Sequence, residues 1–242
     1  MVKHVNTAMI MAAGKGTRMM PLTADRPKPL VEVGGVALLD HVLDHLRDAG
    51  VGKIVVNAHY RADQVEAHLA AHATDFDVSI SDERDLLRDT GGGLVQASPM
   101  ILDDPFICVN ADNWWTNDGK NAISRLMAHW DAARMDVLML LVPLATAYNS
   151  QGIGDFHMDA DGRLSRRVGD ATAPYVWTGI QLLSKKLIMD PPSDVFSTNV
   201  FWDRAITEGR CMGLVHEGMW FDVGYPAAIP ATQERLGLHG IG

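Results

Sequence analysis

Cationic side chains and two glycines lie within one short, proline-rich segment near the N-terminus. The segment covers residues 12–30 and contains Lys15, Arg18 and Lys28. A Gly-x-Gly turn, here Gly14 and Gly16, allows backbone N–H groups to approach a phosphate chain without interference from a Cβ atom. Arginine binds phosphate as a planar fork and lysine binds it as a point charge. The segment therefore predicts a nucleotide site with chemistry on the phosphates.

Two other phosphate-binding patterns and a plain surface loop compete with this interpretation. The dinucleotide fingerprint requires a third glycine and an acidic residue at the end of the next strand, but Met19 and Asn57 occupy these positions. The kinase-type P-loop spacing does not occur in the chain. Pro21, Pro27 and Pro29 count against a plain surface loop, because they stiffen the segment.

Two aspartates far apart in the sequence follow apolar, strand-like runs. Asp112 ends the run at residues 105–111, and Asp222 lies in the run at residues 218–224. Magnesium prefers one or two carboxylates, with phosphate oxygens and waters as its other ligands. Capping of a following turn is the common alternative role for an aspartate at a strand end. Together with the cationic segment, the pair predicts a Mg²⁺ site.

A run of three glycines follows Asp89 and Thr90. Consecutive glycines are costly at the start of a helix unless a flat group lies against the backbone, and a nucleobase would be such a group. An ordinary glycine-rich turn capped by Asp89 or Thr90 is the alternative, and the two interpretations are compatible.

Two histidine pairs have helical i, i+4 spacing. His41 and His45 share a polar stripe with neighbouring aspartates, which predicts a solvated helix face without a zinc site. His68 and His72 repeat the spacing, and the same expectation applies to them. Trp114 and Trp115 follow Asp112; they could stack on a base or a sugar, but core packing is expected for at least one of them.

The first part of the chain alternates apolar runs with amphipathic segments. Apolar strands joined by helices imply a parallel sheet covered on both faces, with ligands beyond the carboxyl ends of its strands. The loop at residues 12–30, Asn57, the turn at 89–93 and Asp112 all fall at such ends. The predicted strands are residues 8–11, 53–57, 77–81, 105–110 and 136–143, and the predicted helices are residues 36–49, 62–72, 91–98 and 119–134.

The pattern changes after residue 143. Residues 154–158 and 163–168 flank a hairpin-type turn, and residues 175–183 form a third extended segment, which predicts a small antiparallel extension acting as a lid or acceptor region. Further predictions are helices at 199–208 and 227–235, a final strand pair at 211–216 and 219–222, and a flexible loop at 148–154. We expect a single domain over residues 1–242, with a nucleotide-binding half at 7–143 and an acceptor half at 144–242.

Composition limits the classes of protein to which the chain can belong. The 242 residues are 47% hydrophobic and carry a net charge of −9, which suits a packed domain and disfavours nonspecific nucleic-acid binding. No apolar run approaches a membrane span, and no signal-peptide core precedes the first strand, so a cytoplasmic protein is expected. Cys108 and Cys211 are expected to be free thiols rather than a disulfide.

The ordered motifs resemble those of the sugar-1-phosphate nucleotidyltransferases. The match begins with the segment at residues 14–29 and continues through the turn at 89–93, the residues 110–112 and the run at 220–224, so it covers nearly the whole chain. The stretches at 56–60, 89–93 and 152–156 are most similar to the N-acetylmuramate-1-phosphate uridylyltransferase branch, with the mannose-1-phosphate guanylyltransferase branch as the near neighbour. The resemblance implies an α/β fold: a Rossmann-like three-layer sandwich with a mostly parallel central sheet.

The resemblance also implies a reaction in which a nucleoside triphosphate and a sugar-1-phosphate give a nucleotide sugar and pyrophosphate, with Mg²⁺ as cofactor. Arg18 and Lys28 would be catalytic, and Asp112 and Asp222 would bind the metal. The nucleotide-binding residues would be Ala12, Ala13, Gly14, Lys15, Gly16, Thr17, Asn57, Thr90, Gly91 and Gly92. The acceptor-sugar residues would be Asn110, Gly154, Asp155, Thr178 and Gly179. The chain is expected to act as a monomer or a homodimer.

Two departures from the family pattern concern the acceptor side. Many relatives place threonine where this chain has Tyr225, and many carry a Glu-Lys pair for which Arg166-Arg167 is the nearest candidate here. Three alternatives stay open: a different acceptor such as glucose-1-phosphate, a cytidylyl or molybdopterin-cofactor transferase, and a nonenzymatic regulatory domain that binds nucleotide sugars. The segments at 27–29 and 220–224 favour the sugar branch over the second alternative, and the full set of metal and phosphate residues counts against the third.

Overall fold

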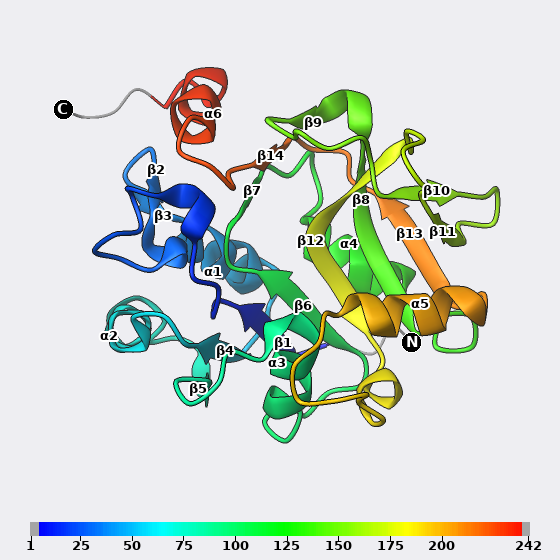
Figure 1. The fold of residues 1–242 in the computed structure, drawn as a ribbon, viewed down its shortest axis with the longest axis horizontal. Coiled ribbons are helices and arrows are strands. Elements are labelled where there is room, and N and C mark those ends of the chain that lie inside the picture. The colour runs from blue at the N-terminus through cyan, green and yellow to red at the C-terminus, as the bar shows by residue number, and fades with distance from the viewer. Residues whose placement is uncertain (1–4, 239–242) are drawn as a thin grey trace.

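The computed structural model describes residues 5–238, which form a sheet covered by helices on both faces (Figure 1). One core packs α1 (Leu38–Asp48), α2 (Ala62–His72) and α4 (Ala122–His129) against the sheet. A second core packs α3 (Asp89–Ala97) and α5 (Asn199–Thr207) against the opposite face. The strands alternate between the two cores: Ile10 belongs to the first and Met9 to the second. The predicted three-layer α/β architecture is confirmed.

The central sheet contains nine strands among residues 5–238. Its main path follows the order β11-β10-β12-β6-β1-β4-β5, and β8 joins β12 to β13. The pairs β1–β4, β1–β6, β4–β5 and β8–β13 are parallel, whereas β12 runs antiparallel to both β6 and β8. The strands are β1 (Thr7–Met11), β4 (Lys53–Ala58), β5 (Asp77–Asp82), β6 (Phe106–Asn110), β8 (Val137–Pro143), β10 (Phe156–Met158), β11 (Leu164–Arg166), β12 (Tyr175–Leu183) and β13 (Cys211–Val215).

A small three-stranded sheet adjoins the central one. It consists of β7 (Asn113–Trp115), β14 (Trp220–Asp222) and β9 (Ala147–Tyr148). It shares a third apolar core with α6 (Ala228–Leu236), which includes Met19, Trp114 and Phe221. The hairpin of β2 (Glu32–Val33) and β3 (Val36–Ala37) lies against α6. These contacts hold the segment that follows residue 30 near β14.

The structure corrects the prediction of a final strand pair at residues 211–216 and 219–222. β13 pairs with β8 in the central sheet, whereas β14 pairs with β7 and β9 in the small sheet. The chain between them passes close to another backbone, since a Cβ on Gly218 would come 1.9 Å from the carbonyl oxygen of Thr116. β13 and β14 therefore belong to different sheets, and β14 is free to bring Asp222 toward β6.

Two predicted helices are shorter than expected. Val36–Ala37 forms β3, so the first helix begins at Leu38. The helix expected from residue 119 begins at Ala122, because Gly119 has a φ of 78° and Asn121 caps the N–H groups of the first turn. It ends before Trp130, which has an extended backbone.

The prediction of a solvated face on the first helix is wrong for His41 and His45. The His41 ring stacks on Trp114 with 3.7 Å between the ring centroids, and the His45 ring stacks on Trp115 at 4.1 Å. His45 and both tryptophans are buried, so core packing is confirmed for both indoles. Burial, with a smaller contribution from the charge of His45, lowers the pKa of His41 to about 3.

Both cysteines are buried free thiols, as predicted. Burial raises the pKa of the Cys108 and Cys211 thiols to about 12, so neither is a reactive thiolate near neutral pH. None of the helices in residues 5–238 combines the length and the apolar character needed to cross a lipid bilayer.

Candidate active site

The phosphate loop (residues 12–30) leaves the carboxyl end of β1 and turns sharply at Gly16. Gly16 has a φ of +64°, and a Cβ there would come 3.0 Å from the Cβ of Lys28 and 3.0 Å from a methyl carbon of Thr23. The Thr23 hydroxyl donates a hydrogen bond to the Gly16 carbonyl at 2.9 Å. Glycine is thus required for its backbone conformation and for the close approach of the segment that carries Lys28.

The residues around the start of α2 hold the phosphate loop in place. Tyr60 donates its hydroxyl to the carbonyl of Thr23 at 2.9 Å, and Gln64 donates to the carbonyl of Asp25 at 3.0 Å. The guanidinium of Arg61 donates to the carbonyl of Ala24 at 2.6 Å. These bonds fix the loop backbone between the glycine turn and Lys28.

Lys28 and Asp112 form an ion pair at the carboxyl edge of the central sheet. The Lys28 side chain is 11% exposed and the Asp112 side chain 31%, so the pair is only partly open to solvent. Asp222 reaches the same place because β14 pairs with β7, which sets Asp222 opposite Asn113. The Nη2 atom of Arg18 lies 3.6 Å from the position that a Cβ on Gly224 would take, next to the Asp222 carboxylate.

All four of these charged residues line one cavity of about 270 Å³, which we call the ionic cavity. It brings together Arg18, Lys28, Asp112 and Asp222 from three distant parts of the sequence. Two carboxylates supply the hard oxygen ligands that Mg²⁺ prefers, and two cations can hold phosphate oxygens beside it. The donor set therefore fits magnesium together with a phosphate chain.

The five residues predicted for the acceptor sugar also line the ionic cavity: Asn110, Gly154, Asp155, Thr178 and Gly179. Two of them are glycines for steric reasons. Gly154 has a φ of +87° and Gly179 a φ of +84°, and a Cβ on Gly179 would meet the Asn113 amide at 2.2 Å. The Thr178 hydroxyl is already used, since it donates to the Leu140 carbonyl at 2.8 Å.

A second cavity of about 450 Å³ adjoins the first, and we call it the loop cavity. Four of the predicted nucleotide-binding residues line it: Ala13, Gly14, Asn57 and Thr90. Asn110 and Asp112 line both cavities, so the two spaces meet at the end of β6. Lys15 and Thr17 are exposed on the phosphate loop and do not line this cavity. The Ala12 N–H donates a hydrogen bond to the Asn57 side-chain oxygen at 2.7 Å.

The structure corrects the explanation for two of the three consecutive glycines near the start of α3. A Cβ on Gly91 would come 2.5 Å from the Phe196 ring, and a Cβ on Gly92 would come 2.2 Å from the Asp194 carbonyl oxygen. The N–H groups of both glycines already donate to the Phe196 carbonyl. Close packing against residues 194–196, rather than a nucleobase, accounts for these two glycines. Neither glycine lines the loop cavity, whereas Thr90 does.

Sequence reasoning missed Glu83, a fully buried carboxylate that lines the loop cavity. It accepts hydrogen bonds from the Asn57 amide at 2.7 Å and from the Arg88 backbone N–H at 3.1 Å. Asn57 thereby links the start of the phosphate loop to Glu83. Glu83 comes just after β5, at the same edge of the sheet as Asn57. This place in the sequence could have identified it as a candidate site residue.

A third space of about 380 Å³, the aromatic cavity, shares Asp155 and Trp177 with the ionic cavity. Arg166 lines it, with its guanidinium 5.1 Å from the centroid of the Phe156 ring and 5.2 Å from that of Trp202. Arg166 donates to the Asp203 carboxylate at 2.9 Å and to the Asn199 side chain at 3.0 Å. A cation is therefore fixed beside the acceptor residues of the ionic cavity.

The fold and this site define a nucleotidyltransferase. Residues 7–166 match the family model described as Nucleotidyl transferase. The chain is similar to HddC from Yersinia pseudotuberculosis, with a TM-score of 0.77 and 25% identity over 96% of this chain and 100% of that one. The chain therefore belongs to the nucleotidyltransferase family.

Two curated relatives identify a more particular likeness. The chain is 40% identical over 232 residues to N-acetylmuramate alpha-1-phosphate uridylyltransferase of Caulobacter vibrioides, covering 95% of this chain and 96% of the relative. It is 28% identical to the enzyme of the same name from Neisseria meningitidis serogroup B, covering 95% of this chain and 98% of the relative. The mannose-1-phosphate guanyltransferase of Neurospora crassa is 28% identical over 90% of this chain and 61% of its own length.

Proposed function

We propose that this chain transfers the uridylyl group of UTP to N-acetylmuramate α-1-phosphate and releases pyrophosphate. The observation that carries the proposal is the ionic cavity, in which Arg18, Lys28, Asp112 and Asp222 face one space beside the acceptor residues. The choice of substrates rests on the 40% identical relative, whose similarity extends over nearly the full length of both chains.

The proposed reaction needs positioning and charge stabilisation rather than a covalent intermediate. The triphosphate lies along the phosphate loop, and the phosphate oxygen of the sugar attacks the α-phosphorus in line with the departing pyrophosphate. Arg18 holds the charge that develops on the transferring phosphoryl group, and Lys28 holds the α-phosphate and the attacking phosphate. Each substrate brings its own charge, so the cations of the site reduce the repulsion between them.

Asp112 and Asp222 are the residues that would hold Mg²⁺, which neutralises phosphate charge when it is bound. In this structure the Lys28 ammonium group donates a hydrogen bond to the Asp112 carboxylate. Phosphate oxygens entering the ionic cavity offer Lys28 another partner, which leaves Asp112 available as a ligand. Lys28 would thus move from the carboxylate to the substrate during binding.

We assign Arg166 to recognition of the group that distinguishes N-acetylmuramate from related sugars. N-acetylmuramate differs from N-acetylglucosamine by a lactyl ether that ends in a carboxylate. A guanidinium binds a carboxylate well when both are partly withdrawn from water. Arg166 lies in the aromatic cavity, which shares Asp155 and Trp177 with the ionic cavity, and its aromatic neighbours restrict its position.

A panel assay of the purified protein tests the proposal. Pyrophosphate release is measured with each common ribonucleoside triphosphate, with N-acetylmuramate-1-phosphate, mannose-1-phosphate or glucose-1-phosphate, and with or without Mg²⁺. We expect release with UTP and N-acetylmuramate-1-phosphate, and only with Mg²⁺. Release with GTP and mannose-1-phosphate but not with UTP would replace the substrate assignment. No release with any pair would reject catalysis and favour a nucleotide-sugar sensor, which needs no metal ligands.

A further inference from the structure

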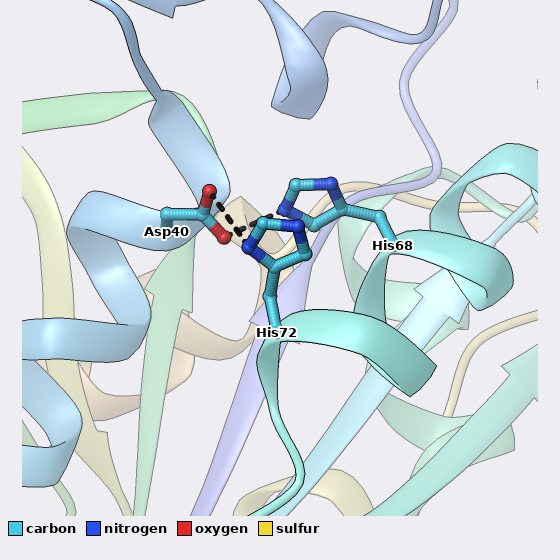
Figure 2. A group of neighbouring side chains, drawn as sticks. All are labelled: Asp40, His68 and His72. Atoms are coloured by element: carbon cyan, nitrogen blue, oxygen red, sulfur yellow. Dashed lines mark hydrogen bonds and ion pairs between the residues drawn. The ribbon is translucent and has the colours of Figure 1, made fainter.

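Asp40, His68 and His72 form a cluster of three potential metal ligands between α1 and α2 (Figure 2). His68 and His72 lie one turn apart at the end of α2, and their rings are nearly parallel with centroids 4.1 Å apart. Asp40 reaches them from the first turn of α1. The ligand atoms of the three residues all lie within 4.8 Å of one another.

One hydrogen bond and one longer polar contact already connect the three residues of the cluster. The Nε2 atom of His68 lies 2.6 Å from one carboxylate oxygen of Asp40, and the Nδ1 atom of His72 lies 3.6 Å from the other. The expectation that this histidine pair is simply solvated is therefore wrong for His68, whose side chain is only 16% exposed. The Asp40 side chain is 22% exposed, so the two partners meet in a partly enclosed place.

The cluster is separate from the candidate active site. None of its three residues lines the ionic, loop or aromatic cavity. His72 is 53% exposed, so one side of the cluster is open to solvent. A cation can therefore enter from the surface, and water can occupy a fourth coordination position.

We propose that Asp40, His68 and His72 bind a divalent transition-metal ion of the zinc class. Two imidazole nitrogens and one carboxylate oxygen are the ligands of many open zinc sites. A tetrahedral site with bonds of about 2.0–2.2 Å needs ligand atoms roughly 3.3–3.6 Å apart. The His72–Asp40 contact of 3.6 Å already suits this spacing, whereas the 2.6 Å contact between His68 and Asp40 has to open when the ion enters. Imidazole ligands favour Zn²⁺, Co²⁺ or Ni²⁺ over the Mg²⁺ that suits the ionic cavity. The inference does not depend on the proposed function.

The bound ion would join the end of α2 to the beginning of α1. Without metal, Asp40 and His68 form a hydrogen bond between the first turn of α1 and the last turns of α2. The two explanations differ in measurable ways. A hydrogen bond between the helices needs no metal, whereas a metal site binds a stoichiometric ion and gains stability from it.

Cobalt absorption of the full-length, untagged protein tests the proposal. The titration is carried out in excess Mg²⁺, which occupies hard oxygen sites elsewhere. We expect one Co²⁺ per chain with the visible bands of tetrahedral coordination, and displacement of these bands by Zn²⁺. Asp40→Asn and His72→Asn should each weaken binding by at least about tenfold. His157→Asn, which changes an exposed histidine of β10, should leave binding unchanged.

Separate controls test whether the variants fold and where in the protein the ion binds. His72 is half-exposed at the end of its helix, so His72→Asn should fold and keep its activity with Mg²⁺. Excess Zn²⁺ should raise the Tm of the wild type but not that of His72→Asn. Absence of Co²⁺ binding by the folded wild type would overturn the proposal, as would wild-type affinity in His72→Asn. Loss of the Co²⁺ bands in Asp222→Asn would instead place the ion in the ionic cavity, which also overturns it.

Discussion

The ammonium group of Lys28 is hydrogen-bonded to the carboxylate of Asp112, although 84 positions separate them in the sequence. The pair joins the phosphate loop to the end of β6. It combines one residue proposed to bind substrate phosphate with one proposed to bind metal. Lys28 therefore competes with the proposed metal ion for Asp112, and Asp112 competes with the substrate phosphates for Lys28.

This competition predicts two opposite effects of Lys28→Met. Turnover should fall by about 10²–10³-fold, because a cation that stabilises the reacting phosphates is lost. Metal binding to the free protein should become tighter, by about tenfold if the ion pair contributes ~1.4 kcal/mol. Electron paramagnetic resonance of Mn²⁺ measures the second effect. Lys53→Met, which removes the lysine of an ion pair with Asp77 on the central sheet, is the matched control. Unchanged Mn²⁺ affinity in Lys28→Met would contradict the competition.

Asp222→Asn separates metal binding from structure. The Asp222 carboxylate accepts the Gly224 backbone N–H at 2.8 Å, and an asparagine oxygen can accept the same bond. We expect an unchanged Tm but at least about a 100-fold loss of turnover and a higher Mg²⁺ requirement. Asp118→Asn, at an exposed position after β7, should behave like the wild type. Full activity of Asp222→Asn at low Mg²⁺ would remove Asp222 from the metal site.

Arg166→Gln should change recognition of the acceptor rather than the rate of the chemical step. We expect the KM for N-acetylmuramate-1-phosphate to rise by about tenfold or more at nearly unchanged kcat, because a charge-assisted bond to the lactyl carboxylate is lost. Binding of N-acetylglucosamine-1-phosphate, measured by competition, should not change. Arg163→Gln, an arginine paired with Asp161 in the same hairpin, provides the comparison. An equal loss for both sugars would show that Arg166 does not recognise the carboxylate.

Gly179→Ala should be much more destabilising than Gly35→Ala. Both glycines have positive φ angles, +84° and +80°, so both variants carry backbone strain of about 1–2 kcal/mol. Only at Gly179 would the new Cβ also collide with the Asn113 side chain, since the position at Gly35 is open. The collision should add about 1–3 kcal/mol to the loss in the free energy of unfolding. Urea denaturation compares the two variants, and equal losses would disprove the steric role of Asn113.

The stability of the protein should fall as the pH falls from 6.5 toward 3. Burial lowers the pKa of His41 from 6.5 to about 3, so the unfolded chain binds a proton in this range and the folded chain does not. Above pH 6.5 the residue is neutral in both states and adds no pH dependence. The loss amounts to about 1.4 kcal/mol for each pH unit below 6.5.

Urea unfolding at about pH 8 and about pH 5 measures this dependence. His41→Gln should reduce the slope of stability against pH, whereas His157→Gln should leave it unchanged. Burial also lowers the pKa values of His45 and His216, so part of the slope should persist in His41→Gln. A wild-type slope in His41→Gln would show that another group is responsible.

Local patterns in the sequence determined the main elements and the edge at which the site lies. Apolar runs such as Phe106–Asn110 predict buried strands, because a strand covered on both faces must be apolar throughout. The chain direction then places Asn57 and Asp112 at one edge of the sheet. The spacing of glycines and cations in the phosphate loop needs no tertiary information either, since the turn and its charges are contiguous.

Only the tertiary structure decided which distant segments meet. Asp222 reaches the ionic cavity because β14 pairs with β7, and local periodicity does not specify a pairing partner. The burial and the contacts of the two histidine pairs also depend on the tertiary structure. His41 and His45 are covered by Trp114 and Trp115, whereas His68 meets Asp40 across two helices. Helical spacing predicts which side chains share a face, but burial depends on what the rest of the chain packs against that face.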